Sequence, residues 1–241
     1  MARNRLTDAQ RWTIAGVAAV AVLLVVVLLV VSGGDDDDDS DLAAGTTTTT
    51  TFAPSVDPFA VAFPSPTDSR RFDAPAAAAR SFATDVLGFG DLVLGGATST
   101  GEATAEVVIQ DREDGPQIFV SLEQLGDGAW YVVGAETEDI VVAVPLPGTS
   151  LGSPFETSGE ALAFEGSVEV SVLAQGDPTP LGQGVVTGSG VPPAGPFEGR
   201  ITFTPPAEAV PGVLVYRITS PEDGRVVQAT AVRVRLTPFT S

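Results

Sequence analysis

The chain contains no cysteine and no histidine, and lysine is absent too, so its 12 basic residues are all arginine. Without cysteine it forms no disulfide and carries no lipoprotein-type lipid anchor. Without histidine or lysine it cannot assemble a Ser-His-Asp relay, a Ser-Lys relay or a Schiff-base lysine. Zinc and most transition metals also bind through cysteine and histidine, which leaves only harder, oxygen-liganded ions. We therefore predict no catalytic, cofactor-binding or metal-binding residues.

Positive charge is scarce, because 31 aspartates and glutamates oppose those 12 arginines and give a net charge of −19. A nucleic-acid ligand requires a basic face that neutralises phosphates, so this composition argues against nucleic acid as a partner. The choice of arginine over lysine is typical of GC-rich bacterial genomes. The 241 residues suffice for one large domain or two small ones, and 26 glycines with 19 prolines indicate many turns.

A long apolar run lies near the N-terminus, where residues 14–31 are uncharged and almost all aliphatic. Extended to residues 12–32 it forms a helix of roughly 30 Å, which matches the hydrocarbon core of a bilayer. The arginines of residues 1–11 all precede it, so the positive-inside rule places that tail in the cytoplasm. We predict a single-pass cell-membrane protein whose signal anchor, residues 12–32, contacts the lipid bilayer and whose C-terminal domains are extracytoplasmic.

A cleaved signal peptide is the alternative interpretation of this run. Its apolar region is commonly about 7–15 residues and ends in a small-x-small site. The run here is longer, and the following Ser32-Gly33-Gly34 matches such a site poorly. Retention as an anchor is therefore the favoured interpretation.

Five consecutive aspartates, Asp35–Asp39, follow the apolar run. Their charge stops the membrane helix on its outer side, since carboxylates enter hydrocarbon at a high cost. A calcium site is the alternative, but a calcium loop spaces its acids along the chain and these are adjacent. The solvated acidic run is the favoured interpretation.

Residues 33–71 as a whole are rich in acid, threonine and proline, and they include the homopolymer Thr46–Thr51. Nothing periodic here can bury a core, so we predict a disordered linker or stalk. Three aromatic residues stand out in it: Phe52, Phe59 and Phe63. They either dock on the folded part or a partner, or are incidental, and the second interpretation is favoured.

Residues 72–143 combine one helical pattern with several strand patterns, which predicts a small α+β domain. Asp73 and Pro75 are expected to start the helix and Gly88 to end it. Its apolar face consists of Ala78, Phe82 and Val86, flanked by Ala79, Ala83 and Leu87. The expected strands are 103–110, 117–125, 129–135 and 140–144, with Trp130 and Tyr131 as anchors of the sheet. One helix against a meandering sheet resembles a truncated cystatin-like or nuclear-transport-factor-like module, here with a packed core rather than a pocket.

Residues 144–238 show turn signals every 8–12 residues with short alternating strands between them. In "SVEVSVL" and "TAVRVRL" every second residue is aliphatic, and polar residues or arginines stand between them. Period-two patterning over about seven strands is typical of an all-β immunoglobulin-like sandwich.

The runs "GSPFETSGEALAFEGSVEVSV", "GPFEGRITF", "SPEDGR" and "ATAVRVRL" give this region a family resemblance. Residues 143–237 resemble the immunoglobulin-like domain of bacterial spore germination proteins. The resemblance implies an extracytoplasmic, non-catalytic module that accompanies other cell-surface domains. The germination process itself is not implied, because residues 72–143 differ from the usual partner domain.

The residues of this motif have structural explanations. Gly159 is expected where a side chain would clash or the strand bends, and Gly166 and Gly224 in tight turns. Glu165 is either a binding carboxylate or a corner acceptor for backbone N–H groups, and the second is favoured. Three aromatics are core candidates: Phe164, Phe197 and Phe203.

These observations favour a membrane-anchored extracytoplasmic protein with a non-catalytic binding or scaffold role, whose partner is an unknown protein or cell-wall polymer. The first alternative is a carboxylate-dependent cell-wall glycan hydrolase, which needs two facing acids in a cleft. The second is an accessory subunit whose membrane helix pairs with other membrane proteins.

Overall fold

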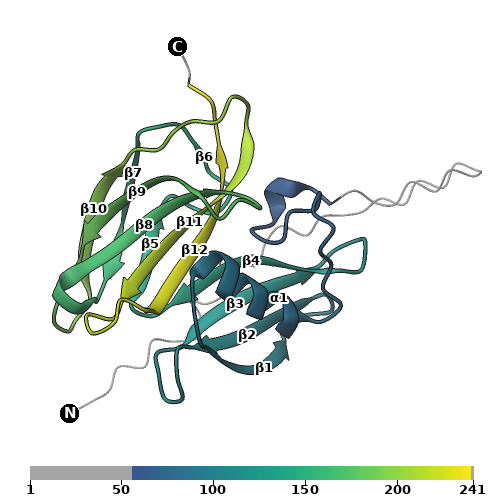
Figure 1. The fold of residues 1–241 in the computed structure, drawn as a ribbon, viewed down its shortest axis with the longest axis horizontal. Coiled ribbons are helices and arrows are strands. Elements are labelled where there is room, and N and C mark those ends of the chain that lie inside the picture. Colours follow the sequence, from purple (N-terminus) through teal and green to yellow (C-terminus); the bar gives the residue numbers. More distant parts are fainter. Residues whose placement is uncertain (1–55, 240–241) are drawn as a thin grey trace, which may run out of the picture. The chain divides into compact units, whose positions relative to one another are not determined.

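The described part of the chain is built mainly from β-strands in a sandwich-like arrangement, with one short α-helix (Figure 1). The structure is a computed structural model that describes residues 56–239. Within that range no helix is both long and apolar enough to cross a bilayer. The predicted span at residues 12–32, the acidic run Asp35–Asp39 and the tract Thr46–Thr51 lie outside the described residues.

A single antiparallel path of strands runs through both predicted modules, in the order β1-β2-β3-β4-β12-β11-β8-β9. The modules meet where β4 pairs with β12, with Gly134 opposite Val232 and Ala135 opposite Ala231. The strands of the path are β1 (Val93–Ser99), β2 (Thr104–Gln110), β3 (Ile118–Gln124), β4 (Trp130–Thr137), β8 (Ser167–Ala174), β9 (Pro180–Thr187), β11 (Val210–Thr219) and β12 (Val226–Leu236).

The helix–sheet module consists of β1–β4 and of α1 (Pro75–Phe82), which continues into the π-turn η3 (Ala83–Leu87). The expected apolar face is confirmed, because Ala78, Phe82 and Leu87 are fully buried against the sheet. Gly88 adopts a φ of 86° and ends the helix as expected. The expected Asp73 cap is wrong: Ala74 occupies that position without a side-chain bond, and the fixed φ of Pro75 starts the helix.

Three of the four expected strands form β2, β3 and β4 of this module, and Tyr131 is fully buried in it as an anchor of the sheet. The fourth, expected at 140–144, is present as a strand but pairs mainly with Phe155–Ala161 of the sandwich. The edge strand β1 was not predicted from the sequence. Its "VLGGATS" contains two adjacent glycines, which weaken a strand pattern, and the register shifts by a bulge between Leu94 and Ala97.

A strap of residues 56–63, which includes the short helix η2 (Pro58–Ala60), differs from the predicted linker. Val61, Ala62 and Phe63 are each at most 2 % exposed. The reason is packing against residues distant in sequence: Ala62 and Phe63 pack against both modules, and Val61 packs against Ala129 and Tyr131 of the helix–sheet module.

The immunoglobulin-like sandwich has a second sheet that faces the β12-β11-β8-β9 part of the path. Its strands are β5 (Ile140–Val144), β7 (Phe155–Ala161) and β10 (Gly195–Ile201), while the short β6 (Ser150–Leu151) runs parallel to β12. Both sheets contribute aliphatic and aromatic side chains to one core. Gly159 is confirmed as a close-approach position, because an added Cβ would meet the Val141 carbonyl and the Phe197 ring.

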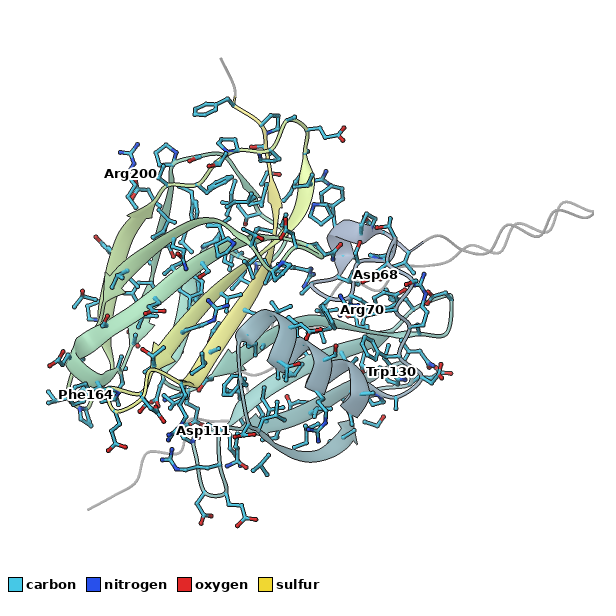
Figure 2. The ribbon with its side chains drawn as sticks, in the orientation of Figure 1. Asp68, Arg70, Asp111, Trp130, Phe164 and Arg200 are labelled. Atoms are coloured by element: carbon cyan, nitrogen blue, oxygen red, sulfur yellow. The ribbon has the colours of Figure 1, made fainter. Side chains whose placement is uncertain are left out.

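Two of the three aromatic core candidates are confirmed, and the third is wrong. Phe197 and Phe203 are buried, but Phe164 is 60 % exposed. Phe164 begins the 3-10 turn η4 (Phe164–Gly166) at one end of the sandwich, so its side chain points past the ends of the strands instead of between the sheets (Figure 2).

Candidate binding sites at the junction of the two modules

Arg217 on β11 joins the sandwich to the helix–sheet module. Its Nε donates to the carbonyl of Leu87 at 2.7 Å, and its Nη2 donates to the carbonyl of Val86 at 2.7 Å. Carbonyls at a helix C-terminus lack partners within the helix, and a cation there also favours the helix dipole. Nη1 donates to Ser171 Oγ on β8 at 2.9 Å, which holds the guanidinium in place. Burial lowers the pKa of Arg217 from its usual value.

The arginines of the alternating β12 pattern serve the same junction. Arg233 donates from Nη1 to the carbonyl of Val133 at 3.2 Å. The guanidinium of Arg235 lies 3.4 Å from the ring centroid of Phe59, in a cation–π contact with the strap. The face of β12 that carries these arginines, which is polar in the sequence pattern, therefore contacts other parts of the same protein.

The strap closes the junction from one end. Gln175, after β8, donates from Nε2 to the carbonyl of Val61 at 2.8 Å. Val132 on β4 accepts from the amide of Ala62 at 2.8 Å and donates to the carbonyl of Phe63 at 2.7 Å. Of Phe59 and Phe63, the two linker aromatics singled out above that lie within residues 56–239, Phe63 is the buried one, and its contacts tie the strap to both modules.

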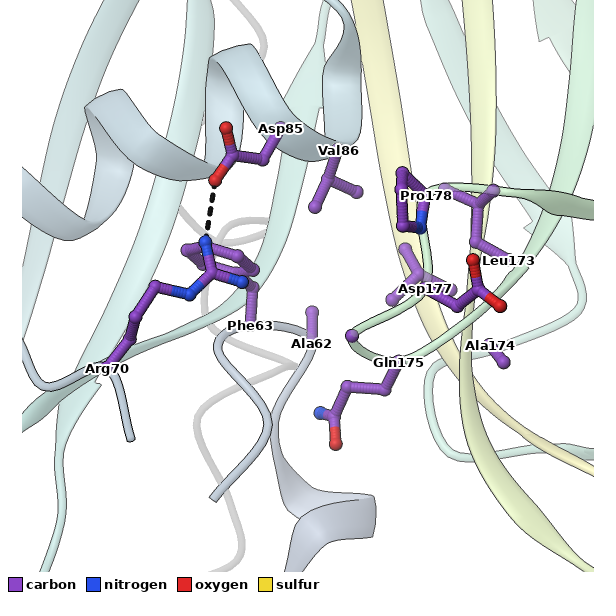
Figure 3. Close-up of a pocket in the computed structure, with 12 residues that line it drawn as sticks. Ala62, Phe63, Arg70, Asp85, Val86, Leu173, Ala174, Gln175, Asp177 and Pro178 are labelled. Carbon is purple, nitrogen blue, oxygen red and sulfur yellow. Dashed lines mark hydrogen bonds and ion pairs between the residues drawn. The ribbon is translucent and has the colours of Figure 1, made fainter. Parts of the chain in front are cut away.

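A cavity of about 290 Å³, the junction cavity, lies between the strap, the end of the helix and the β8–β9 turn (Figure 3). Most of its wall is apolar and comes from both modules, with Phe63, Val86 and Val213 among the lining residues. Its polar lining residues are Arg70, Asp85, Gln175 and Asp177. Arg70 Nη1 lies 2.7 Å from Asp85 Oδ2, and its Nε lies 2.8 Å from Asp68 Oδ2.

The hydrogen bond from Arg70 lowers the pKa of Asp68, and the same bond raises the pKa of Arg70. The carboxylates of Asp68 and Asp85 therefore both form ion pairs with the guanidinium of Arg70. The junction cavity consequently offers an apolar surface without an unmatched positive charge.

A larger groove of about 410 Å³, the end groove, lies at the opposite end of β11 and β12. Its walls are the β2–β3 turn, the η4 corner and the β11–β12 turn, so both modules again contribute. Both apolar and polar residues line it: Arg112, Pro116, Leu162, Ala163, Phe164, Ile218, Thr219, Ser220, Pro221, Glu222, Arg225, Val227 and Gln228.

Asp111 beneath this groove bridges the two modules. Only 1 % of its side chain is exposed, and Oδ2 lies 2.7 Å from Arg112 Nη1 and 3.5 Å from Arg225 Nε. Arg225 also binds Asp223 at 2.6 Å, and this hydrogen bond raises the pKa of Arg225. Both arginines of the end groove are therefore paired with carboxylates of the protein.

The η4 corner holds Phe164 in a fixed position at the edge of the end groove. Glu165 adopts a φ of 54°, which is uncommon outside glycine, and Gly166 follows with a φ of 73°. Gly166 accepts a 2.8 Å hydrogen bond from the amide of Gly188, and no room exists there for a Cβ. The tight turns expected at Gly166 and Gly224 are confirmed, since both have positive φ.

The structure brings together residues that sequence analysis did not select. Glu165, weighed as a binding carboxylate or a corner acceptor, is exposed, and neither role is supported by a hydrogen bond of its side chain among residues 56–239. Arg112 stands in the acidic turn sequence "DREDG" and Arg225 in "SPEDGR". Each sequence predicts a turn, but nothing in it predicts that the two turns share a groove. Among those same residues no group of three acidic side chains is placed to hold a metal ion.

Comparison with known families identifies the sandwich. Residues 139–225 match the family described as the immunoglobulin-like domain of bacterial spore germination. No curated protein and no solved structure matches the chain.

Proposed function

Since residues 139–225 carry an immunoglobulin-like domain of the spore germination type, which is not a known catalytic domain, we propose that this chain is a membrane-tethered binding or scaffold protein. Residues 12–32 cross the membrane once, residues 1–11 are cytoplasmic, and the two joined modules are extracytoplasmic. The family match is the observation that carries the proposal, and the apolar run with its preceding arginines supports the location.

The way in which the modules are joined supports a binding role. Arg217, Arg233 and Asp111 all make contacts across the junction, so the surfaces on either side of the end groove stay fixed relative to each other. A preorganised surface loses less entropy when it binds a partner. Immunoglobulin-like domains also place their binding loops at the ends of the sandwich, where the end groove lies.

The end groove is far from the point where the tether joins the fold. Phe59 of the strap contacts Arg235 near the C-terminal end of β12, whereas the groove is lined by residues before and at its N-terminal end. β12 has 11 residues and spans roughly 35 Å. On a tethered protein this separation leaves the groove free to meet a partner.

Cysteine labelling tests the location, because the natural chain contributes no thiol. Ser40→Cys in the full-length protein is expected to react with a membrane-impermeant maleimide on intact cells. Ala2→Cys, in the tail, is the matched control and is expected to react only after lysis. Labelling of Ser40→Cys only in lysed cells would overturn the proposed orientation.

A turnover assay separates binding from the hydrolase alternative. The purified full-length protein is expected to leave cell-wall glycan chains uncut, as measured by the release of reducing ends. Release that disappears when one carboxylate of the end groove is replaced, as in Glu222→Gln, would establish hydrolysis and contradict the scaffold role.

A further inference from the structure

The end of the sandwich beside the end groove exposes two large apolar side chains. Phe164 is 60 % exposed and Val191 is 70 % exposed. Their backbones are neighbours, because the amide of Ala163 donates to the carbonyl of Ser189 and an added Cβ on Gly190 would lie 3.6 Å from Glu165 Cα. We call this apolar pair the sandwich tip.

Backbone hydrogen bonds join the η4 turn of the sandwich tip to residues Gly188 and Ser189. Phe164 starts the η4 turn, and the left-handed φ of Glu165 stores strain that only a firmly packed surrounding maintains. An aromatic side chain presented on a fixed backbone beside a groove is typical of the residues that dominate binding energy at interfaces. From the sequence alone, a place in the hydrophobic core would explain Phe164 equally well. Its exposure excludes that explanation.

The charges around the sandwich tip are unbalanced and negative. Arg112 and Arg225 are already paired with Asp111 and Asp223. Four further carboxylates on the turns that form this end have no salt bridge within residues 56–239: Glu113, Asp114, Glu165 and Glu222. The tip is thus an apolar surface with a rim of unmatched acid, on a chain whose net charge is −19.

We propose that the sandwich tip and end groove dock a cationic polypeptide segment that carries an apolar side chain. Phe164 and the apolar walls of the groove take the apolar side chain, and the four rim carboxylates meet lysine or arginine residues on either side. The negative field of the protein steers such a segment toward the surface and repels anionic partners. The proposal rests on the proposed binding function and names the class of partner.

The test uses full-length protein in nanodiscs of zwitterionic lipid, with empty nanodiscs as background, and three fluorescent peptides of equal length. One peptide combines lysine with leucine, the second combines lysine with serine, and the third combines glutamate with leucine. Fluorescence anisotropy is expected to give the tightest binding for the lysine–leucine peptide and none for the glutamate–leucine peptide.

Two phenylalanine variants locate the binding. Phe164→Ser is expected to weaken binding of the lysine–leucine peptide by about tenfold or more, the loss typical of an interface hot spot. Phe239→Ser is the matched control, since Phe239 is 76 % exposed but lies after β12, away from the groove. Its effect is expected to stay within about twofold, as for a surface residue outside an interface.

A charge variant tests the rim. Glu222→Gln is expected to weaken binding by about threefold at low salt, and the difference is expected to shrink at high salt because screening weakens the attraction. The proposal is overturned if the lysine–serine peptide binds as tightly as the lysine–leucine peptide, if both phenylalanine variants act alike, or if the glutamate–leucine peptide binds best. These results are independent of the cysteine labelling, so a failure of this inference leaves the proposed location standing.

Discussion

Arg217 of the sandwich donates a 2.7 Å hydrogen bond to the carbonyl of Leu87, the last residue of the π-turn in the other module. This single side chain also reaches Val86 and Ser171. It therefore satisfies carbonyls that would otherwise be left without partners in the junction. We therefore expect it to couple the stability of the two modules.

Arg217→Met is expected to lower the free energy of unfolding by about 2–4 kcal/mol, because it leaves partly buried carbonyls without donors. Urea unfolding of the full-length protein, followed by circular dichroism, measures the change. Arg200→Met is the control, since Arg200 is exposed and its nearest carboxylate oxygen, on Glu156, is 3.7 Å away. Its effect is expected to stay within about 0.5 kcal/mol. Equal effects of the two variants would show that Arg217 does not couple the modules.

Because Tyr216 is buried, we expect the protein to lose stability at high pH. Burial raises its pKa to about 12, from the ordinary value of 10.0. The unfolded chain therefore ionises first, so this contribution is complete below pH 10 and is lost as the pH rises from 10 toward 12. A rise of about two units corresponds to roughly 2–3 kcal/mol over that window.

The variant Tyr216→Phe isolates this effect. At pH 7 it is expected to cost about 1 kcal/mol, because it removes the 2.7 Å hydrogen bond to Thr157. Between pH 10 and pH 12 its stability is expected to fall less steeply than that of the natural protein. Parallel curves of unfolding free energy against pH would contradict the assignment.

We expect position 159 in β7 to tolerate no side chain larger than that of glycine. Gly159→Ala is expected to destabilise the protein by about 2–4 kcal/mol, because the added methyl group overpacks the core. It would lie 2.8 Å from Phe197 Cζ and also meet the Val141 carbonyl. Gly96→Ala on the edge strand β1 is the control, since nothing lies within 4 Å of its Cβ position. Thermal unfolding should separate the two variants, and a similar melting temperature for both would refute the packing argument.

Because Phe63 is buried, we expect the strap to contribute to the stability of the folded protein. Phe63→Ala is expected to cost about 3–5 kcal/mol, as for other buried phenylalanines. Its ring packs 5.9 Å from that of Phe72 and 5.8 Å from that of Phe82. Phe164→Ala serves as the comparison, and because that ring is exposed its cost is expected to stay within about 0.5 kcal/mol. If denaturant midpoints show no difference between them, the strap contributes nothing to stability.

Strands β8 and β12 of the sandwich were predictable from sequence because apolar residues alternate with polar ones along them. What the pattern does not reveal is that the polar face of β12 is covered: Arg233 and Arg235 alternate with valines just as solvent-exposed residues do. A period of two identifies which residues share a face but not what lies on it. The junction between the modules was therefore missed.

The strap and the sandwich tip were missed for opposite reasons. Val61, Ala62 and Phe63 stand among prolines and threonines, so composition indicated a linker although three apolar residues in a row suffice to fill a gap. Phe164 stands in a motif of core residues, so its type indicated burial although its turn directs it outward. In both cases the outcome depends on contacts that are distant in sequence.

The position of β12 in the sheet determines when the protein can finish folding. It is synthesised after the other strands of residues 56–239, yet it lies between β4 and β11 and is needed by both modules. Until it leaves the ribosome, β4 and β11 each present an open edge, and neither half can complete its hydrogen bonding. The chain therefore reaches its native state only after translation has passed residue 236, when one strand completes both halves together.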